Sequence, residues 1–428
     1  MSEFKTVRGM RDLLPEEARI MKHIEAKARR AGELYGFKEI ITPIVESYEL
    51  LSAKAGDEVR SRMFVFKDMG DRMIALRPEF TASVARLVAT ALRTEPKPFR
   101  LFSVGSIYRY DEPQKGRYRE FWQSNFELIG SNRPEADAEI ILLTDSFMKS
   151  VGLKPAMKIG HVGVLRGIFN QEKLEDKTQN AIMQLMDKQL YDDAMERLEN
   201  AEISNEGLEI IRRLVELKGS NVFDVVAKMM TTVAGYEKAV GATENLNEIL
   251  KLISLSGTNI DMTVNAGFAR GLEYYTGMIF EVYVPDMNMA LGGGGRYDRL
   301  IELFGGDPTP AVGVAHGLDR IMLGMQEKKA MEGIGQERTV MVVPVQEELR
   351  PEALKIAQQL RNQDIRVEVE VMGRKMGKAL EDADRRKIDC VVIVGERELR
   401  EGAVVLKKLE KREQATVKIE GLAEAIVA

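Results

Sequence analysis

Polar and apolar side chains alternate along "EFWQSNFELIG", residues 120–130. Residues two apart on a strand share a face, so one face would combine an aromatic ring with three polar groups: Phe121, Gln123, Asn125 and Glu127. The other face would be a plain core face: Trp122, Phe126 and Leu128. An ordinary half-exposed strand is one interpretation. A polar face that carries a phenylalanine is unusual for a solvated surface. The other interpretation is therefore that this face forms the wall of a ligand pocket.

The loop before this strand concentrates positive charge. The segments "FRLFSVGSIYRY" and "FWQSNFELIG" are predicted strands, and four basic residues stand between them or at their ends: Arg109, Lys115, Arg117 and Arg119. Guanidinium groups bind phosphate oxygens in bidentate fashion. A hairpin with a basic loop and a polar inner face therefore indicates a site for a polyanion, with a solvated charged turn as the alternative.

A second polar strand end occurs in "RGLEYYTGMIFEV", residues 270–282. The segment is apolar from Met278 on, but it begins with an arginine, a glutamate and two tyrosines. A period of two places Arg270 and Tyr274 on one face, and tyrosine hydroxyls both donate and accept hydrogen bonds. This end either frays into solvent or lines a pocket for a small polar ligand.

Two further segments have a composition that suits a binding site. The run "GGGGRYDRL", from Gly292, offers no side chain to pack, which permits close approach of another backbone or a ligand, or else forms a flexible turn. The segment "AVGVAHGLDRIML", residues 311–323, predicts a strand that runs into a helix near Gly317. Arg320 would lie on the first turn of that helix, to pair with a carboxylate or to contact a ligand.

Other chemistries are excluded by what the chain lacks. Its three histidines, His23, His161 and His316, are far apart, and its one cysteine is Cys390. We therefore expect no zinc site, no Cys/His nucleophile and no internal disulfide. A single cysteine also fits a reducing compartment, so we expect a cytoplasmic location. No P-loop motif, signal peptide or membrane-spanning apolar run is present. Any phosphate chemistry must depend on arginines. The net charge of −5 does not itself indicate nucleic-acid binding.

The pattern of predicted elements divides the chain of 428 residues into an α+β core and a smaller α/β domain. We assign residues 1–166 and 257–325 to a core with an antiparallel sheet flanked by helices. Residues 167–256, where helical periodicity dominates, form a predicted helical insertion. Residues 326–338 read as a linker, and residues 339–428 alternate strand and helix.

These segments, in this order, resemble the class II aminoacyl-tRNA synthetases, and more narrowly the histidyl-tRNA synthetase family. "YGFKEIITPIVES", predicted as a strand, resembles the class II dimer motif, which implies a homodimer. The hairpin with its basic loop resembles the second class motif, and "AVGVAHGLDRIML" the third. "RPEFTAS", "RGLEYYTGMIFEV" and "LGGGGRYDRL" resemble segments peculiar to the histidine enzymes. The resemblance extends over nearly the whole chain.

The resemblance implies a pocket for free histidine. Glu79 and Thr81 resemble the pair that engages its α-amino end. Gln123 and Glu127 resemble amino-acid contacts, and Glu127 with Tyr274 or Tyr275 would contact the imidazole. Because both nitrogens of an imidazole form hydrogen bonds, a carboxylate and a phenol suit them.

The resemblance also implies ATP as the second substrate, with Mg²⁺ on its β- and γ-phosphates. Arg109 resembles the arginine that bridges the carboxylate and the α-phosphate, and Arg270 the catalytic arginine at that phosphate. Both arginines also belong to the implied histidine-binding set. Phe121 and Arg320 resemble the groups that sandwich the adenine. Arg117 resembles a loop contact to the phosphates.

Binding of tRNA(His) is implied for two regions. Lys115 and Arg117 lie in the basic loop, and the C-terminal domain resembles the family's anticodon-binding domain. A local basic face there would include Arg374 and Lys375, followed by Lys378, Arg385 and Arg386. A solvated helix surface is the alternative. The helical insertion is expected to clamp the acceptor arm.

Three residues depart from the family pattern: Phe80, Trp122 and Glu273. Trp122 and Glu273 are expected to point away from the site, whereas Phe80 is expected to narrow the pocket entrance. The implied function is activation of L-histidine by ATP and transfer to tRNA(His). A non-catalytic histidine-binding regulator of ATP phosphoribosyltransferase is the alternative; it typically lacks the anticodon domain and the "RGLEYY" arginine, and both are present here. A bare RNA-binding module would leave the polar set without a purpose.

Overall fold

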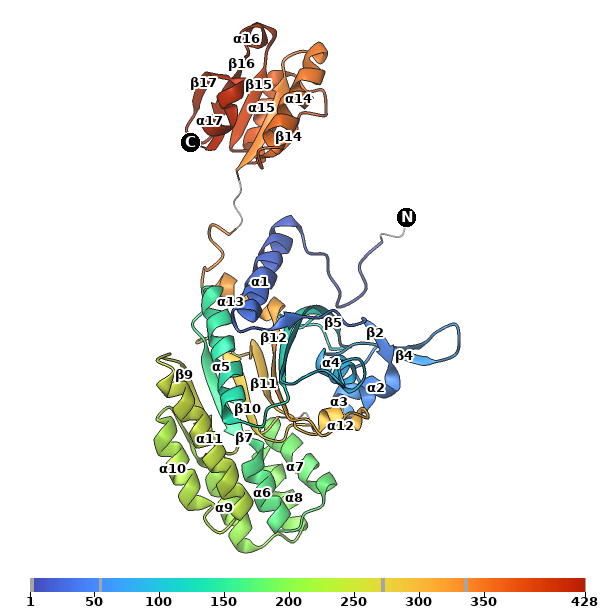
Figure 1. Cartoon of the computed structure of the whole chain (residues 1–428), viewed down its shortest axis with the longest axis vertical. Coiled ribbons are helices and arrows are strands. Elements are labelled where there is room, and N and C mark those ends of the chain that lie inside the picture. Colours follow the sequence, from blue (N-terminus) through green and yellow to red (C-terminus); the bar gives the residue numbers. More distant parts are fainter. Residues whose placement is uncertain (1–3, 54–55, 271–273, 335–337, 428) are drawn as a thin grey trace. The chain divides into compact units, whose positions relative to one another are not determined.

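The computed structural model describes residues 4–53, 56–270, 274–334 and 338–427 (Figure 1). Contacts divide the chain into two compact units, Met1–Ile334 and Gly335–Ala428, and this division falls within the predicted linker 326–338. Each unit is described by itself. Among the described residues, no helix is both long enough and apolar enough to cross a membrane.

The first unit is built on a sheet in which nine strands are described, ordered β1-β5-β6-β12-β11-β10-β7-β9-β8. In chain order the strands are β1 (Lys38–Glu39), β5 (Phe99–Tyr108), β6 (Glu120–Ile129), β7 (Ala156–His161), β8 (Lys218–Gly219), β9 (Asp261–Asn265), β10 (Met278–Tyr283), β11 (Gly292–Arg296) and β12 (Ala311–Gly317). The α+β class predicted from the sequence is confirmed. The sheet is mixed rather than wholly antiparallel, because β1 pairs parallel with β5 and β9 pairs parallel with β7. Parallel neighbours need a crossover connection, and the helices between β7 and β9 provide one.

Three helices pack on one face of this sheet: α1 (Pro15–Leu34), α5 (Pro134–Ser150) and α13 (Leu318–Glu327) (Figure 1). Both α1 and α5 start with proline at the first turn, where the missing N–H costs nothing. The strand β6 turns Phe126 into this layer, where its ring stacks on Phe102 at 5.5 Å. The predicted core face of residues 120–130 is thus the helix-covered face, and the polar face points to the other side.

A small sheet and short helices stand beside the other face. Its strands are ordered β2-β4-β3, with bounds Val45–Ser47 (β2), Val65–Lys67 (β3) and Met73–Leu76 (β4). The helices near it are α2 (Tyr48–Ser52), α3 (Asp57–Arg60), α4 (Thr81–Ala89) and α12 (Leu300–Leu303). The single strand predicted over residues 35–47 is wrong: the segment divides into β1 and β2, which belong to different sheets. Pro43, which has no N–H to donate to a ladder, lies between them.

Six helices occupy the chain between β7 and β9. They are Val162–Gln171, Asp176–Asp187, Tyr191–Asn200, Asn205–Glu216, Val222–Thr232 and Glu237–Leu255, for α6 to α11. Side-chain caps begin several of them; Ser204 Oγ, for example, accepts from Gly207 N at 3.0 Å. Their apolar faces join the same buried cluster as the sheet, for example at Ile182 and Ile249. The helical region is therefore packed onto the core.

The second unit is a five-stranded sheet, ordered β14-β13-β15-β16-β17 within the described residues. The strands span Thr339–Pro344, Arg366–Val369, Cys390–Val394, Ala403–Lys408 and Glu413–Lys418, for β13 to β17. The helices are α14 (Arg350–Arg361), α15 (Met376–Arg385), α16 (Glu396–Arg400) and α17 (Leu422–Val427). The first three strands are parallel and joined through α14 and α15, and the last two are antiparallel. Buried valines on β13 and β15 form the core, which includes Cys390.

Candidate active site

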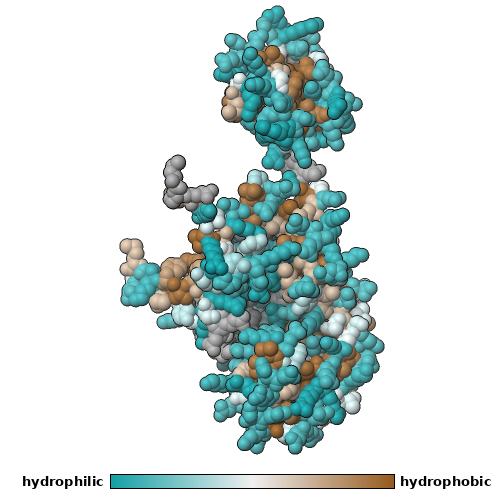
Figure 2. Space-filling view, turned by 180° about the vertical axis from the view of Figure 1, so that it is seen from behind, coloured by the Kyte–Doolittle hydropathy of each residue, from teal (hydrophilic) through white to brown (hydrophobic). Residues whose placement is uncertain are grey.

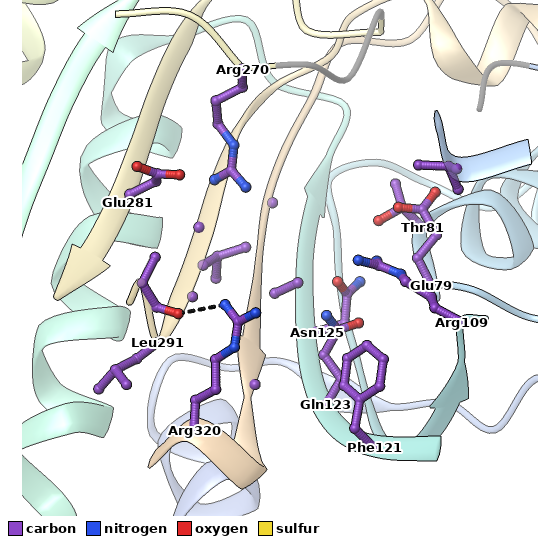
Figure 3. Close-up of a pocket in the computed structure, with 18 of the residues that line it drawn as sticks. Glu79, Thr81, Arg109, Phe121, Gln123, Asn125, Arg270, Glu281, Leu291 and Arg320 are labelled. Carbon is purple, nitrogen blue, oxygen red and sulfur yellow. Dashed lines mark hydrogen bonds between the residues drawn. The ribbon is translucent and has the colours of Figure 1, made fainter. Parts of the chain in front are cut away.

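The polar face of β6 forms one wall of a cavity of about 340 Å³ in the first unit. Its lining comes from β6, β10, β11 and β12, from the starts of α4 and α13, and from the loop between β5 and β6. Figure 3 shows Arg270, Glu281 and Arg320 on one side of it, and Glu79, Arg109 and Gln123 on the other. Segments far apart in the sequence therefore bring three arginines and several polar groups to one space.

Glu127 lies at the bottom of this cavity and is only 1% exposed. Three side chains donate hydrogen bonds to its carboxylate: Thr81 Oγ1 at 2.8 Å, Asn125 Nδ2 at 2.7 Å and the Tyr297 hydroxyl. Burial raises the pKa of Glu127 to about 7, and these donors oppose the rise. The neighbouring strand β12 leaves room for the Glu127 carboxylate because it has a glycine there. A Cβ on Gly313 would lie 1.7 Å from Glu127 Oε2.

Glu79 and two tyrosines lie beside this carboxylate. The Tyr274 hydroxyl donates to Glu79 Oε2 at 3.3 Å, and the rings of Tyr274 and Tyr275 are 4.9 Å apart. Burial raises the pKa of Glu79, and the charge of Arg109 opposes the rise. Burial also raises the pKa of both tyrosines, which keeps them neutral donors near pH 7. The site thus offers two carboxylates and phenol groups to a ligand with N–H donors.

Arg270 lies over the glycine strand β11. Its Nη1 donates to Phe280 O at 3.0 Å, and a Cβ on Gly293 would lie 1.7 Å from that nitrogen. Burial lowers the pKa of Arg270, but the facing Tyr275, Glu281 and Asp187 outweigh it and the pKa is raised. Of the two interpretations of the glycine run, close approach is the one found. The group that approaches the glycine backbone is the Arg270 side chain of the same protein.

The strand predicted to start at residue 270 starts only at Met278. Tyr274 and Tyr275 both line the cavity, which strict alternation on a strand would not permit. The prediction that period two governs this segment is therefore wrong. Glu273 lies outside the described residues.

Phe121, Arg320, Arg109 and Arg117 line the part of the cavity toward the β5–β6 loop. Arg320 Nη1 donates to Ala290 O at 2.8 Å, and Arg109 Nε donates to Pro78 O at 2.9 Å. Burial lowers the pKa of Arg320, and the positive charges of Arg117 and Arg109 lower it further. Three guanidinium groups at one end of the cavity create a positive potential suited to an anion such as a polyphosphate.

Gln123 adds an unsatisfied acceptor to the same wall. It is 8% exposed, and within the described residues its Oε1 is buried without a hydrogen-bond partner. Buried polar atoms are rarely left unpaired, so this oxygen indicates a donor supplied by a ligand.

Comparisons with known proteins agree with this arrangement. The family model described as histidyl-tRNA synthetase matches residues 9–321, and the anticodon binding domain model matches residues 339–428. The chain belongs to the histidyl-tRNA synthetase family. The family predicted from the sequence is therefore confirmed.

Relatives match the chain from end to end. It is 44% identical to the histidine–tRNA ligase of Methanococcus maripaludis strain C7 over 99% of each chain. It is 37% identical to the histidine–tRNA ligase of Saccharolobus solfataricus strain P2, over 100% of this chain and 99% of that one. The histidyl-tRNA synthetase structure from Nostoc sp. PCC 7120 matches with a TM-score of 0.83 at 26% identity, over 100% of this chain and 99% of that one.

A fourth comparison bears on the regulatory alternative. A Bacillus halodurans structure described as an ATP phosphoribosyltransferase regulatory subunit/histidyl-tRNA synthetase matches with a TM-score of 0.75 at 26% identity, over 89% of this chain and 96% of that one. The two archaeal ligases are more similar in sequence and cover more of the chain. The comparisons favour the family's ligases over the regulator.

Of the residues that depart from the family pattern, Phe80 and Trp122 are described, and neither lines the cavity. Phe80 does not narrow the entrance, and that prediction is wrong: the side chain is 1% exposed, packs in the core beside α4, and carries the Arg77 guanidinium 4.3 Å from its ring. Trp122 turns away from the cavity, as expected, and packs against the core. Asn125, which the strand period placed on the polar face, lines the cavity, and so do Tyr297 and Glu281, which no sequence pattern singled out.

The residues predicted to contact tRNA are not part of this cavity, except Arg117. Lys115 is exposed and pairs with Glu327 at 3.1 Å. In the second unit, Arg374 pairs with Glu370 at 3.0 Å and with Asp382 at 3.5 Å, and Arg385 and Arg386 also pair with Asp382. Lys375 is exposed just before α15. The acidic partners neutralise much of the predicted basic face.

The two buried histidines, His161 and His316, lie outside the cavity lining. Within the described part of the chain, no group of three or more His, Cys, Asp or Glu side chains is arranged to hold a metal ion. His161 accepts from Gly163 N at 3.1 Å, and His316 lies between Ser124 and Thr144 at 3.2 Å from each hydroxyl. Burial lowers their pKa values to about 4 and about 3, so both rings are neutral core groups.

Proposed function

We propose that the chain is a histidine–tRNA ligase, which activates L-histidine with ATP to histidyl-adenylate and then transfers histidine to the 3′ end of tRNA(His). The observation that supports this most directly is one cavity in which Arg109, Arg270 and Arg320 converge with the buried carboxylate of Glu127. This arrangement suits a reaction between an amino acid and a polyphosphate. The family's ATP-dependent ligases supply the reaction class.

The first step requires two negatively charged reactants to meet. A carboxylate oxygen of histidine attacks the α-phosphorus of ATP, a new P–O bond forms, and the bond to the leaving pyrophosphate breaks. Such a reaction needs positioning and charge stabilisation rather than a nucleophilic side chain. We assign this stabilisation to Arg270 and Arg109, which approach the cavity from opposite sides (Figure 3).

Histidine recognition is assigned to the polar wall. Glu127 would accept from an imidazole N–H, and Tyr274 or Tyr275 would serve the other nitrogen. Glu79, Thr81 and Gln123 would hold the α-amino end, where the unpartnered Gln123 Oε1 gains a donor. A pocket whose buried polar groups are paired only by the correct ligand rejects analogues that leave them unpaired.

The nucleotide is assigned to the other end of the cavity. Phe121 and Arg320 would enclose the adenine, and Arg117 with Arg109 would contact the phosphates. Mg²⁺ would be held chiefly by the β- and γ-phosphates, and Glu281 is one of several carboxylates that line the cavity. Bound there, the ion neutralises charge on the leaving pyrophosphate.

The remaining parts are assigned by the family's architecture. We propose the division made from the sequence: a core of residues 1–166 and 257–325, an insertion of residues 167–256 that contacts the acceptor arm, and a tRNA-binding unit of residues 339–428. Lys115, Arg117, Arg374 and Lys375 remain proposed tRNA contacts. For Arg374 the contact would require exchange of its present carboxylate partners.

A homodimer is proposed from the small sheet. Its outer face and flanks leave a group of large apolar side chains exposed, seen as a brown patch in Figure 2: Ile41, Ile44, Val45, Val65, Phe66, Met69 and Met73. Contiguous apolar surface of this kind marks interaction sites. A second copy of the chain is the occupant that the class II dimer motif at residues 35–47 implies. A cytoplasmic location is proposed from the same family resemblance.

One assay tests the function: ATP–pyrophosphate exchange with each amino acid in turn. We expect exchange with histidine and with none of the others. Arg270→Ala should reduce exchange by about 10²–10³-fold, the cost of removing one preorganised charge-stabilising group, with little change in histidine affinity. The matched control is Arg30→Ala, an exposed arginine on α1 paired with Glu33. Histidine binding without exchange in the unaltered protein would instead support the regulatory alternative.

A further inference from the structure

A short N-terminal segment, residues 8–11, runs along the β5–β6 loop that carries Arg117. Gly9 O accepts from Arg119 N at 2.8 Å. Gly9 has a φ of +85°, and a Cβ there would lie 2.7 Å from Arg119 Cγ and 3.1 Å from Pro113 Cγ. Glycine alone adopts this conformation at this separation without strain. The segment is thus fastened to the loop at the backbone.

Arg11 extends from this segment to two other elements. Its guanidinium lies 3.8 Å from the centroid of the Tyr118 ring and forms an ion pair with Asp319 on the first turn of α13. Asp319 is 2% exposed, and its other carboxylate oxygen accepts from Trp122 N on β6 at 2.6 Å. Arg11 does not itself line the cavity.

Each residue in this network is the chain neighbour of a residue that faces the nucleotide end of the cavity. Tyr118 follows Arg117, Trp122 follows Phe121, and Asp319 precedes Arg320. Arg117, Phe121 and Arg320 all line the cavity. Tyr118 and Asp319 also line the cavity themselves, whereas Trp122 does not. The Arg11 guanidinium therefore joins the three backbone segments that present these side chains.

The Arg11–Asp319 pair also has an electrostatic role. Burial raises the pKa of Asp319, and the Trp122 N–H and the charge of Arg11 oppose that rise. Removing a cation from a buried pair leaves the other charge uncompensated, which favours rearrangement of the site around it. Asp319 on α13 is bonded to Trp122 on β6, so its rearrangement would change the position of Arg320 relative to Phe121.

We propose that Arg11 is a positioning residue for the nucleotide: by joining Tyr118, Asp319 and, through Asp319, Trp122, it holds Arg117, Phe121 and Arg320 in register for ATP. The proposal rests on the proposed ligase function, and it concerns ATP only. Glu127, Tyr274 and Glu79, assigned to histidine, make no contact with this network among the contacts of the described residues.

The same segment offers a matched control. Arg8 forms an ion pair with Glu112 at 2.9 Å, but the two side chains are 74% and 79% exposed. An exposed pair of this kind contributes little. Arg8→Met therefore removes an arginine three residues away, bonded to the same loop, without touching Tyr118 or Asp319.

The test compares Arg11→Met, Arg11→Lys and Arg8→Met by histidine-dependent ATP–pyrophosphate exchange. For Arg11→Met we expect the KM for ATP to rise on the order of tenfold, the scale of one lost hydrogen bond to a charged group, while the KM for histidine is unchanged. Arg11→Lys keeps the charge but not the planar group, so it should recover part of the effect and also covers the case in which Arg11→Met does not fold. Arg8→Met should match the wild-type protein.

Trp122 supplies an independent readout. It is the single tryptophan of the chain, so all indole fluorescence comes from the network itself. An ATP titration followed at this signal should give a weaker Kd for the Arg11 variants, and their emission without ATP should already differ from wild type. An unchanged KM and Kd for ATP in Arg11→Met, or equal increases for ATP and histidine, would overturn the proposal. No exchange in the wild-type protein would refute the ligase assignment instead, so the two failures are distinguishable.

Discussion

Gly293 leaves open the space that the Arg270 guanidinium occupies. A Cβ on Gly293 would lie 1.7 Å from Arg270 Nη1 and 3.0 Å from Phe280 O, the acceptor of that same nitrogen at 3.0 Å. Gly293 pairs with Glu281 on β10 and Ala315 on β12, in the middle of the sheet. A strand position that normally carries a side chain is therefore left open for the guanidinium of Arg270, the proposed catalytic arginine.

This relationship predicts the effect of Gly293→Ala. The methyl group must displace the guanidinium, so histidine-dependent exchange should fall by about 10²–10³-fold, as for loss of Arg270 itself. Histidine affinity should change little, because Gly293 takes no part in the hydrogen bonds of Glu127. The measurements are exchange kinetics and calorimetric titration with histidine. Gly241→Ala on α11, where an added Cβ meets nothing within 4 Å, is the control and should keep full activity. Near-normal exchange in Gly293→Ala would contradict the placement of Arg270.

Tyr297→Phe tests the hydrogen bond behind the histidine pocket. Its hydroxyl donates to Glu127 and opposes the rise in that carboxyl's pKa. Its removal should raise the pKa of Glu127 further and so increase the KM for histidine on the order of tenfold near pH 7. The kcat/KM profile should shift to higher pH, a change that simple loss of folded protein would not produce. Tyr236→Phe, which loses a 2.6 Å bond to Glu172 in the helical region, should leave the profile unchanged.

Glu127 should also make stability depend on pH. Burial raises its pKa from the ordinary 4.5 to about 7 in the folded protein. Between these values the folded chain keeps a proton that the unfolded chain has released. The contribution of Glu127 to the free energy of unfolding is therefore present at low pH and is lost as pH rises toward 7. The full effect corresponds to about 3 kcal/mol.

Glu127→Gln removes this titration. As pH rises from about 4.5 to about 8, the wild-type protein should lose about 3 kcal/mol of stability through this group, whereas the variant should not. The difference in free energy of unfolding, variant minus wild type, should therefore rise by about 3 kcal/mol over this range. Lost hydrogen bonds from Thr81, Asn125 and Tyr297 add an offset that does not vary with pH. Urea denaturation across this range gives the difference directly. Parallel pH curves for the two proteins would show that Glu127 has an ordinary pKa.

Local pattern was sufficient for part of the site. The period of a strand placed Phe121, Gln123, Asn125 and Glu127 on one face, and the structure has them on the cavity wall. The predicted transition from a strand of small residues to a helix near Gly317 placed Arg320 on the first turn of that helix. In the structure Arg320 lies on the first turn of α13. Both inferences needed only backbone geometry within one segment.

Relationships between distant segments were beyond such patterns. Tyr297 meets Glu127 across 170 residues of sequence, through the neighbouring strands β11 and β12. Phe80 was misplaced because a motif position does not reveal that Arg77 and the α4 core enclose the ring. The segment after Arg270 was misread because a strand pattern from Met278 on does not fix where the strand begins. The basic face predicted around Arg374 was counted from its cations alone, and the nearby acidic residues Glu370 and Asp382 pair with Arg374 in the structure.

The division of the chain predicts that the two reaction steps separate. All lining residues of the cavity belong to the unit that ends at Ile334, and the second unit has its own core. A chain that ends after residue 334 should therefore keep histidine-dependent exchange near the full-length rate. Charging of tRNA(His) should weaken, chiefly through a higher KM for tRNA, because the proposed anticodon contacts are lost. Exchange and charging are measured on the same preparation, so a misfolded fragment would lose both. Full charging by the fragment would remove the tRNA-binding role from residues 339–428.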